Sequence, residues 1–301
     1  MQCAANQPLL PKMKHMKKKI AITGLLLIGL SLYFTKDLGQ LFASGEPAIK
    51  EPLKSSSRVT IVKQWDLPDE LREVSGIAYI NEGRFACVQD EDGYIFIYNT
   101  AEGRIEQKIP FAGAGDYEGI ALAGPHAYIV RSDGTLYEVL NYALENREVK
   151  TYKTPLNADH NIEGLTYDSK SRRLLVSVKD EDPNMKDRKG IYTFDLSAKQ
   201  LSQQPAYAIA THDARYNSRG KKGVRPSDIG IHPGTGSHFI IDGPGQKLLV
   251  FDSAGQLQDV SELGAAFAKP EGITFDPAGS IFISNERGKH AAANIMQIVT
   301  K

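Results

Sequence analysis

Short runs of alternating apolar and polar residues, separated by Gly, Pro, Asn and Asp, occupy most of the chain after residue 58. This two-residue period is typical of half-buried β-strands. One phrase recurs among the runs: SGIAYI at Ser75, EGIALA at Glu118, EGLTYD at Glu163, SDIGIH at Ser227 and EGITFD at Glu271. The intervals between successive phrases are 43, 45, 64 and 44 residues. A period of this length, built from strands and turns, predicts the blades of a β-propeller.

Each repeat contains the same order of strands. The phrase is followed by a turn, a second apolar strand, a polar corner and a third strand, and four repeats add a fourth strand. The long interval carries two polar insertions, near residues 181–189 and 211–224, with the composition of surface loops. The last repeat stops at Lys301 before its fourth strand, whereas residues 59–67 form a spare strand ahead of the first repeat. We therefore expect an all-β fold, a five-bladed β-propeller closed by this N-terminal strand.

A single hydrophobic segment precedes the repeats. The run 20–34 has 15 residues and no charge, lies before Lys36, and follows five lysines, Lys12, Lys14, Lys17, Lys18 and Lys19. A basic segment before an apolar run is the pattern of a secretory signal or a membrane anchor. Fifteen residues are short for a span, which needs about 20, but no good cleavage site follows, so an uncleaved anchor is favoured and a cleaved signal stays open. We expect a cytoplasmic basic segment and signal or anchor helix at 1–36, a linker at 37–57 and the propeller at 58–301.

Composition excludes several classes of protein. The chain has 301 residues, 36 basic and 36 acidic side chains and 41% hydrophobic residues, which argues against a disordered or polybasic chain. Its two cysteines, Cys3 and Cys87, are too few for a disulfide framework or a zinc site. The basic cluster between Arg215 and Arg225 is interpreted as a solvated loop because the chain is neutral overall. No nucleic-acid partner is expected.

Three glutamates occupy equivalent positions in the repeats. The first strand of each propeller blade lines the central channel, so Glu118, Glu163 and Glu271 are expected to face one axis. When carboxylates lie close together in a buried place, either the pKa of each group rises or a cation neutralises their charges. An oxygen-rich site favours calcium, which accepts six to eight oxygens. Asp228, which replaces the glycine of its phrase, is the next candidate ligand, and a solvated channel entrance without a metal is the alternative.

Two histidines are weak candidates for a general base. His160 lies three residues before Glu163, and His212 falls in a polar insertion, so both are expected near the channel mouth. The Asp and Asn residues that follow the second strands are interpreted mainly as turn formers. The sequence contains no nucleophile elbow, phosphate-binding loop or dinucleotide fingerprint. No catalytic residue is therefore assigned.

The phrases together resemble a known family. ELREVSGIAY, DYEGIAL, NIEGLTYD, RPSDIGIHP and KPEGITFDPAGSIFISNE are similar to the SdiA-regulated, or YjiK-like, family of bacterial envelope proteins, over about residues 58–298. The resemblance implies a five-bladed propeller distantly related to NHL-repeat proteins, with a calcium site at the channel and association with the inner membrane. It implies metal ligation by Glu118, Glu163 and Glu271, with Asp228 next. In the first phrase, Ser75 occupies the position at which an acidic residue would add a ligand.

These observations lead to two functional hypotheses. The first is a membrane-tethered, calcium-binding propeller in the periplasm, with a single N-terminal span, that acts as a binding or scaffold module for a small ligand or an envelope protein. The second is a calcium-dependent hydrolase of esters, lactones or phosphotriesters, in which the ion polarises a carbonyl or phosphoryl oxygen. A base beside the metal would favour the hydrolase, whereas carboxylates and backbone alone would favour the binding module.

Overall fold

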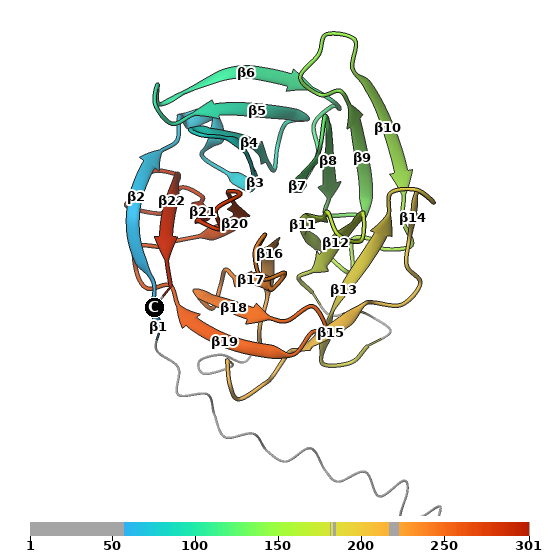
Figure 1. Ribbon diagram of the computed structural model, residues 1–301, viewed down its shortest axis with the longest axis vertical. Coiled ribbons are helices and arrows are strands. Elements are labelled where there is room, and N and C mark those ends of the chain that lie inside the picture. The colour runs from blue at the N-terminus through green and yellow to red at the C-terminus, as the bar shows by residue number, and fades with distance from the viewer. Residues whose placement is uncertain (1–56, 181, 183–184, 217–222, 301) are drawn as a thin grey trace, which may run out of the picture. The chain divides into compact units, whose positions relative to one another are not determined.

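The repeats form the blades of a propeller. The computed structural model describes residues 57–180, 182, 185–216 and 223–300, and their strands form five sheets arranged around one axis (Figure 1). The predicted all-β, five-bladed fold is confirmed. The predicted hydrophobic helix and all but the last residue of the predicted linker lie outside the described residues. Within the described part of the chain, no helix is long and apolar enough to cross a membrane.

The strands of each blade are antiparallel, and the first one lies nearest the axis. Blade 1 contains β3 (Val74–Asn81), β4 (Arg84–Gln89), β5 (Tyr94–Asn99) and β6 (Arg104–Pro110). Blade 2 contains β7 (Tyr117–Ala123), β8 (His126–Arg131), β9 (Thr135–Leu140) and β10 (Glu148–Lys153). Blade 3 contains β11 (Ile162–Asp168), β12 (Arg173–Val178) and β13 (Arg188–Asp195), and its outer edge is divided between β14 (Gln200–Leu201) and β15 (Tyr207–Ala210).

The two ends of the described chain meet in the last blade. Blade 4 contains β16 (Pro226–Ile231), β17 (His238–Asp242), β18 (Lys247–Phe251) and β19 (Leu257–Glu262), with β1 (Ser57–Arg58) parallel to β19. Blade 5 contains β20 (Pro270–Phe275), β21 (Ile281–Asn285) and β22 (Asn294–Val299), and β2 (Thr60–Asp66) is its outer strand. Figure 1 shows blue β2 beside red β22. The predicted closure by an N-terminal strand is confirmed, and a 3-10 turn, η1 (Asp69–Leu71), leads from β2 towards β3.

The hydrophobic core lies between the blades. Its buried side chains fall into five clusters, and each cluster combines two neighbouring blades. Between blades 1 and 5, for example, the rings of Phe85 and Phe282 pack edge to face with centroids 5.1 Å apart. Because successive side chains of a strand point to opposite faces, each blade can pack against both of its neighbours. The inner strands are thereby left to line the axis.

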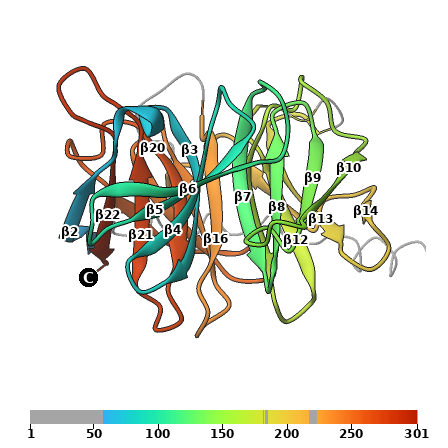
Figure 2. The same ribbon diagram turned by 90° about the horizontal axis from the view of Figure 1, so that it is seen from above.

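Neighbouring inner strands approach closely at the recurring glycine. A Cβ atom at Gly119 would lie 2.9 Å from Leu165, and one at Gly76 would lie 3.0 Å from the Cα of Gly119. Any side chain at these positions would push adjacent blades apart, which explains why the phrase repeats its glycine. Figure 2 shows the strands running between the two faces of the propeller. We call the face where the inner strands begin the entry face and the face where they end the exit face.

Candidate functional site

Every inner strand has a β-bulge at the same place. The strand register shifts between Val74 and Gly76 in β3, and shifts at the equivalent place in β7, β11, β16 and β20. The residues left between the paired positions are Ser75, Glu118, Glu163, Ser227 and Glu271. A bulge re-aims the side chain of its extra residue out of the regular alternation. The repeats thus present five equivalent side chains near the entry face.

The three glutamates at these bulges form one carboxylate cluster. Burial raises the pKa of Glu118 to about 10, and the charges of Glu163 and Asp116 add to this rise. Burial also raises the pKa of Glu163 to about 7, with a further contribution from the charge of Glu271. Glu163 therefore resists the ionisation of Glu118, and Glu271 resists that of Glu163, as expected for like charges in a poorly solvated place. We use the name carboxylate cluster for Glu118, Glu163 and Glu271.

A lysine that follows a different strand lies beside this cluster. Lys179 directly follows β12, and its Nζ lies 2.9 Å from Oε2 of Glu163. Burial works to lower the pKa of Lys179, but the charges of Glu163, Glu271 and Glu118 outweigh it, and the pKa is raised. The ammonium therefore neutralises part of the cluster. Sequence reasoning missed Lys179, although a lysine directly after the buried run of β12 was a visible signal.

Asp228 holds three blades together. Its Oδ1 accepts hydrogen bonds from the amides of Ile229, at 2.7 Å, and Leu165, at 3.2 Å, and its Oδ2 accepts one from the amide of Ile273, at 2.8 Å. Burial raises the pKa of this carboxyl, and the three amide donors, which favour the ionised form, oppose the rise. Both oxygens of the predicted metal ligand are thus engaged by backbone groups of blades 3, 4 and 5.

The two candidate histidines occupy different surroundings. His160 is buried, its Nδ1 lies 2.9 Å from Oδ1 of Asn157, and its Nε2 lies 3.8 Å from Oδ1 of Asp182. His212 is exposed in a turn that follows β15. The largest influences on the pKa values of Glu118, Glu163 and Lys179 come from burial, carboxylates and the lysine itself, and neither histidine is among them.

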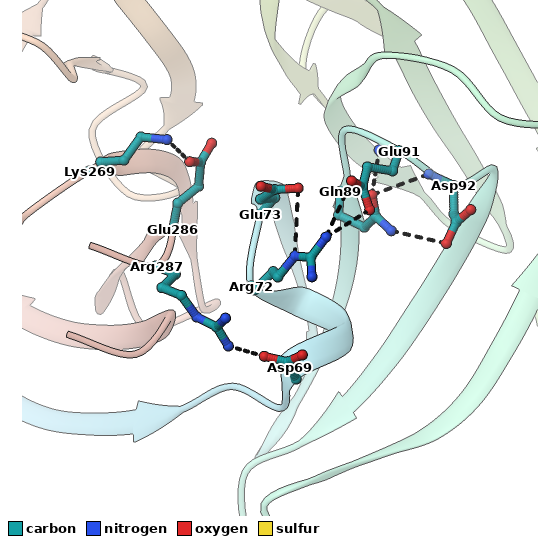
Figure 3. A network of polar contacts seen from close by, with 9 residues as sticks. All are labelled: Asp69, Arg72, Glu73, Gln89, Glu91, Asp92, Lys269, Glu286 and Arg287. Carbon is teal, nitrogen blue, oxygen red and sulfur yellow. Dashed lines mark hydrogen bonds and ion pairs between the residues drawn. The ribbon is translucent and has the colours of Figure 1, made fainter. Parts of the chain in front are cut away.

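A second group of charges flanks the cluster on blade 1. Burial raises the pKa of Asp90 to about 6, and the charges of Glu73 and Asp116 add to the rise. Oδ1 of Asp90 is buried and has no hydrogen-bond partner in the described part of the chain. Figure 3 shows the neighbouring network, in which Arg72 pairs with Glu73 and Glu91 at 3.8 and 3.4 Å.

The same network connects blade 5 to the segment that leads into β3. Arg287 forms an ion pair with Asp69, and its backbone amide donates to the carbonyl of Arg72 at 2.8 Å. A polar cavity of about 370 Å³ lies over blade 1 and is lined by residues that include Arg72, Glu73 and Glu91. Negative charge therefore extends from the axis across the entry side of blade 1.

The carboxylate cluster is not arranged as a ready-made metal cage. Across residues 57–180, 182, 185–216 and 223–300, no group of three or more His, Cys, Asp or Glu side chains has the geometry to hold a metal ion. The donors themselves are hard oxygen atoms, the type that calcium prefers. Lys179 is the cation that the structure places beside them.

Comparison with known proteins identifies the family. The SdiA-regulated family model matches residues 50–288. The chain belongs to the SdiA-regulated family. This confirms the resemblance that the recurring phrases indicated. No curated protein sequence matches the chain.

Solved structures show that the fold of this SdiA-regulated protein is widely shared. Glutaminyl cyclase of Myxococcus xanthus is 13% identical with a TM-score of 0.58, and the match covers 82% of this chain and 99% of the other. The PQQ-bound aldose sugar dehydrogenase of Streptomyces coelicolor is 14% identical with a TM-score of 0.51, covering 83% and 100% of the two chains. At this identity the likeness concerns the fold alone, because propellers host many unrelated functions.

Proposed function

We propose that this protein is a calcium-binding module of the bacterial envelope whose ion is bound by the carboxylate cluster at the entry face. The supporting observation is that the carboxylates of this cluster are buried close together. Burial and repulsion between neighbouring charges raise the pKa of Glu118 to about 10 and the pKa of Glu163 to about 7. At neutral pH the Glu118 carboxyl therefore retains its proton and the Glu163 carboxyl is partly protonated unless a further cation arrives. A divalent ion would displace those protons and favour the ionised form of all three glutamates.

The donor set favours calcium over transition metals. Glu118, Glu163 and Glu271 offer carboxylate oxygens, which suit hard cations, and calcium tolerates irregular coordination with water completing the shell. Asp228 acts as a structural residue and not as a ligand in this proposal, because its two oxygens already accept hydrogen bonds from three backbone amides. Lys179 competes with the ion for Glu163 and so lowers the affinity.

The surroundings of the cluster favour a binding module over a hydrolase. A hydrolase that uses the ion to polarise a substrate also needs a base within reach of the attacking water. His160 is buried against Asn157 and Asp182, and His212 is exposed in a turn. Carboxylates and one ammonium dominate the environment of the cluster, so its chemistry is that of ion binding and recognition of a partner at the entry face.

The location proposed for the module is the periplasmic side of the inner membrane. Support comes from the family and from the five lysines that precede the apolar run 20–34. A tether between that run and Ser57 would leave the propeller free to meet a small ligand or an envelope protein.

Calcium-dependent stability tests this function. The full chain should melt at a higher temperature with calcium than with a chelator, because an ion at 100 times its dissociation constant adds about 2.7 kcal/mol to the free energy of unfolding. Glu163→Gln should abolish this increase, and Glu148→Gln, at an exposed position on β10, should retain it. Equal melting temperatures with calcium and chelator for the unaltered chain would refute the proposal.

A further inference from the structure

A hollow lies on the axis at the exit face. This exit-face cavity has a volume of about 400 Å³ and is lined by residues of all five inner strands. It exists because one position of each strand holds a small residue: Ala78, Ala121, Thr166, Gly230 and Thr274. The next position holds a larger side chain, Tyr79, Leu122, Tyr167, Ile231 and Phe275, and these form the wall. The cavity thus arises because the same pattern of small and large residues recurs in each repeat. It lies at the opposite end of the inner strands from the carboxylate cluster.

Three aromatic rings and one carboxylate give this cavity its chemistry. Tyr79, Tyr167 and Phe275 line it, and of the described residues in its wall Asp276 alone carries a charge. Oδ1 of Asp276 accepts the amides of Ala278 at 3.0 Å and Ser280 at 2.8 Å. Oδ2 accepts no hydrogen bond from any described residue. After burial, the charge of Asp276 is the largest cause of the raised pKa of Tyr79, which shows that ring and carboxylate share one environment.

The aromatic wall is held in place from behind. The ring of Tyr79 stacks on Phe282 with centroids 5.8 Å apart, and the ring of Phe275 meets Phe239 edge to face at 5.2 Å. These partners belong to the cores between the blades, so the wall does not have to be ordered when a ligand enters. A preformed site avoids the entropic cost of fixing side chains on binding.

A smaller hollow continues the cavity over blades 3 and 4. It has a volume of about 250 Å³ and shares Tyr167, Ile231 and Pro233 with the exit-face cavity. The two together extend from the axis to the turn that contains His232. A ligand seated at the axis can therefore extend a substituent in this direction.

We propose that the exit-face cavity binds a small organic cation, an alkylammonium group that bears an apolar substituent. Aromatic faces attract cations through their quadrupoles, and sites for alkylammonium groups commonly combine several rings. Asp276 adds a negative charge, and among the described residues no basic side chain lines the exit-face cavity itself, whereas Lys170 lines the smaller hollow beside it. The volume lies within the range of sites for small molecules, about 300–1,000 Å³. This site is separate from the proposed calcium site and does not depend on it.

Three probes of one shape test the charge preference. Benzyltrimethylammonium, benzyl alcohol and benzylsulfonate share the phenylmethyl group and differ in charge. Isothermal titration of the purified full chain should show the cation binding at least about tenfold more tightly than the alcohol and the sulfonate. No binding of the cation up to about 10 mM, or equal binding of the alcohol or sulfonate, would overturn the proposal.

A matched pair of variants tests the location. Asp276→Asn removes the charge but keeps the Oδ1 acceptor of the turn. Asp252→Asn makes the same change at a similar turn outside the cavity, where Oδ1 accepts the amides of Ala254 at 3.0 Å and Gln256 at 2.9 Å. Asp276→Asn should weaken binding of benzyltrimethylammonium about tenfold, whereas Asp252→Asn should leave it unchanged.

A third variant makes the test independent of the turn. Tyr167→Leu removes one ring and should also weaken binding of the cation several-fold, with benzyl alcohol much less affected. Glu163→Gln, at the other end of β11, should bind the cation as the unaltered chain does, which separates this site from the calcium site. Equal affinity in Asp276→Asn, Tyr167→Leu and the unaltered chain would place the cation elsewhere and contradict the proposal.

Discussion

Lys179 and Glu163 meet at the entry face with Nζ and Oε2 separated by 2.9 Å, although Glu163 lies on β11 and Lys179 directly follows β12. The charges of Glu118 and Glu271 also act on this ammonium. One positive charge thus partly neutralises three carboxylates, and burial disfavours the ionisation of two of them, Glu118 and Glu163.

Replacing the internal cation should strengthen calcium binding. Lys179→Met removes the ammonium but keeps much of the side-chain volume, so we expect the affinity for calcium to rise about tenfold, as competition for Glu163 ends. Isothermal titration of the full chain measures this change. Lys170→Met, at an exposed turn of the exit face, is the control. Unchanged or weaker calcium binding in Lys179→Met would show that the lysine does not compete with an ion.

The carboxylate cluster should make stability depend on pH when calcium is absent. The pKa of Glu163 is 4.5 when unperturbed and about 7 in the folded chain, so between these values the folded state holds a proton that the unfolded state has released. Stability conferred by this proton is present below pH 4.5 and is lost as the pH rises towards 7, by up to about 1.4 kcal/mol per pH unit. Glu118 adds a loss of the same sign that begins at the same pH and continues towards about pH 10.

Denaturant unfolding at a series of pH values, with and without calcium, checks this dependence. Calcium stabilises the ionised carboxylates, so it should flatten or reverse the decline. Glu163→Gln should make the decline between pH 5 and pH 7 clearly shallower, and the decline that remains comes from Glu118. If the free energy of unfolding depends on pH in the same way for the unaltered chain and for Glu163→Gln in chelator, the pKa of Glu163 is not raised in the folded chain.

Asp228 should contribute to the stability of the fold and not to the binding of calcium. Asp228→Asn presents an amide where Oδ2 now accepts the Ile273 N–H, so we expect the free energy of unfolding to fall by about 2 kcal/mol or more. Asp195→Asn, whose Oδ1 accepts two amides at a partly exposed turn, should change it little. Calcium stoichiometry in folded Asp228→Asn should stay the same, and loss of the ion from that variant would assign Asp228 to the metal.

Closure of the propeller should depend on β2. A chain that lacks residues 57–66 exposes the edge of β22, and we expect it to aggregate or unfold at a lower temperature. A peptide of residues 59–67 added in trans should restore the melting temperature, and a scrambled peptide should not. Trp65, the only tryptophan, packs near Phe282 with centroids 6.4 Å apart, so its fluorescence reports binding of the peptide. A truncated chain as stable as the unaltered one would show that closure contributes little.

Most of the fold could be predicted from the repeat pattern. The recurring phrase predicted five blades because it occurs five times, and its glycine recurs because a Cβ atom at Gly119 would lie 2.9 Å from Leu165. The spare strand at 59–67 predicted the closure, and β2 pairs with β22 as expected. The bulge at Glu118 and its equivalents could not be predicted, because it depends on hydrogen-bond register rather than on residue type.

The candidate site was predictable in part. The glutamates were recognised because they occupy one position of a repeat, but Lys179 was missed because it lies outside that phrase, after the second strand. Asp228 was assigned to the metal by its place in the phrase, and its bonds to Leu165 and Ile273 depend on how the blades pack. The exit-face cavity was overlooked, although its small and large residues also recur with the repeat.

A crystal structure of the full chain grown with calcium, with the ion located by its anomalous scattering, tests directly whether the carboxylate cluster binds calcium. We expect one peak at the entry face, with oxygens of Glu118, Glu163 and Glu271 about 2.3–2.6 Å from it and Lys179 displaced from Glu163. No peak there, with the Lys179 ammonium still paired to Glu163 at saturating calcium, would contradict the proposal.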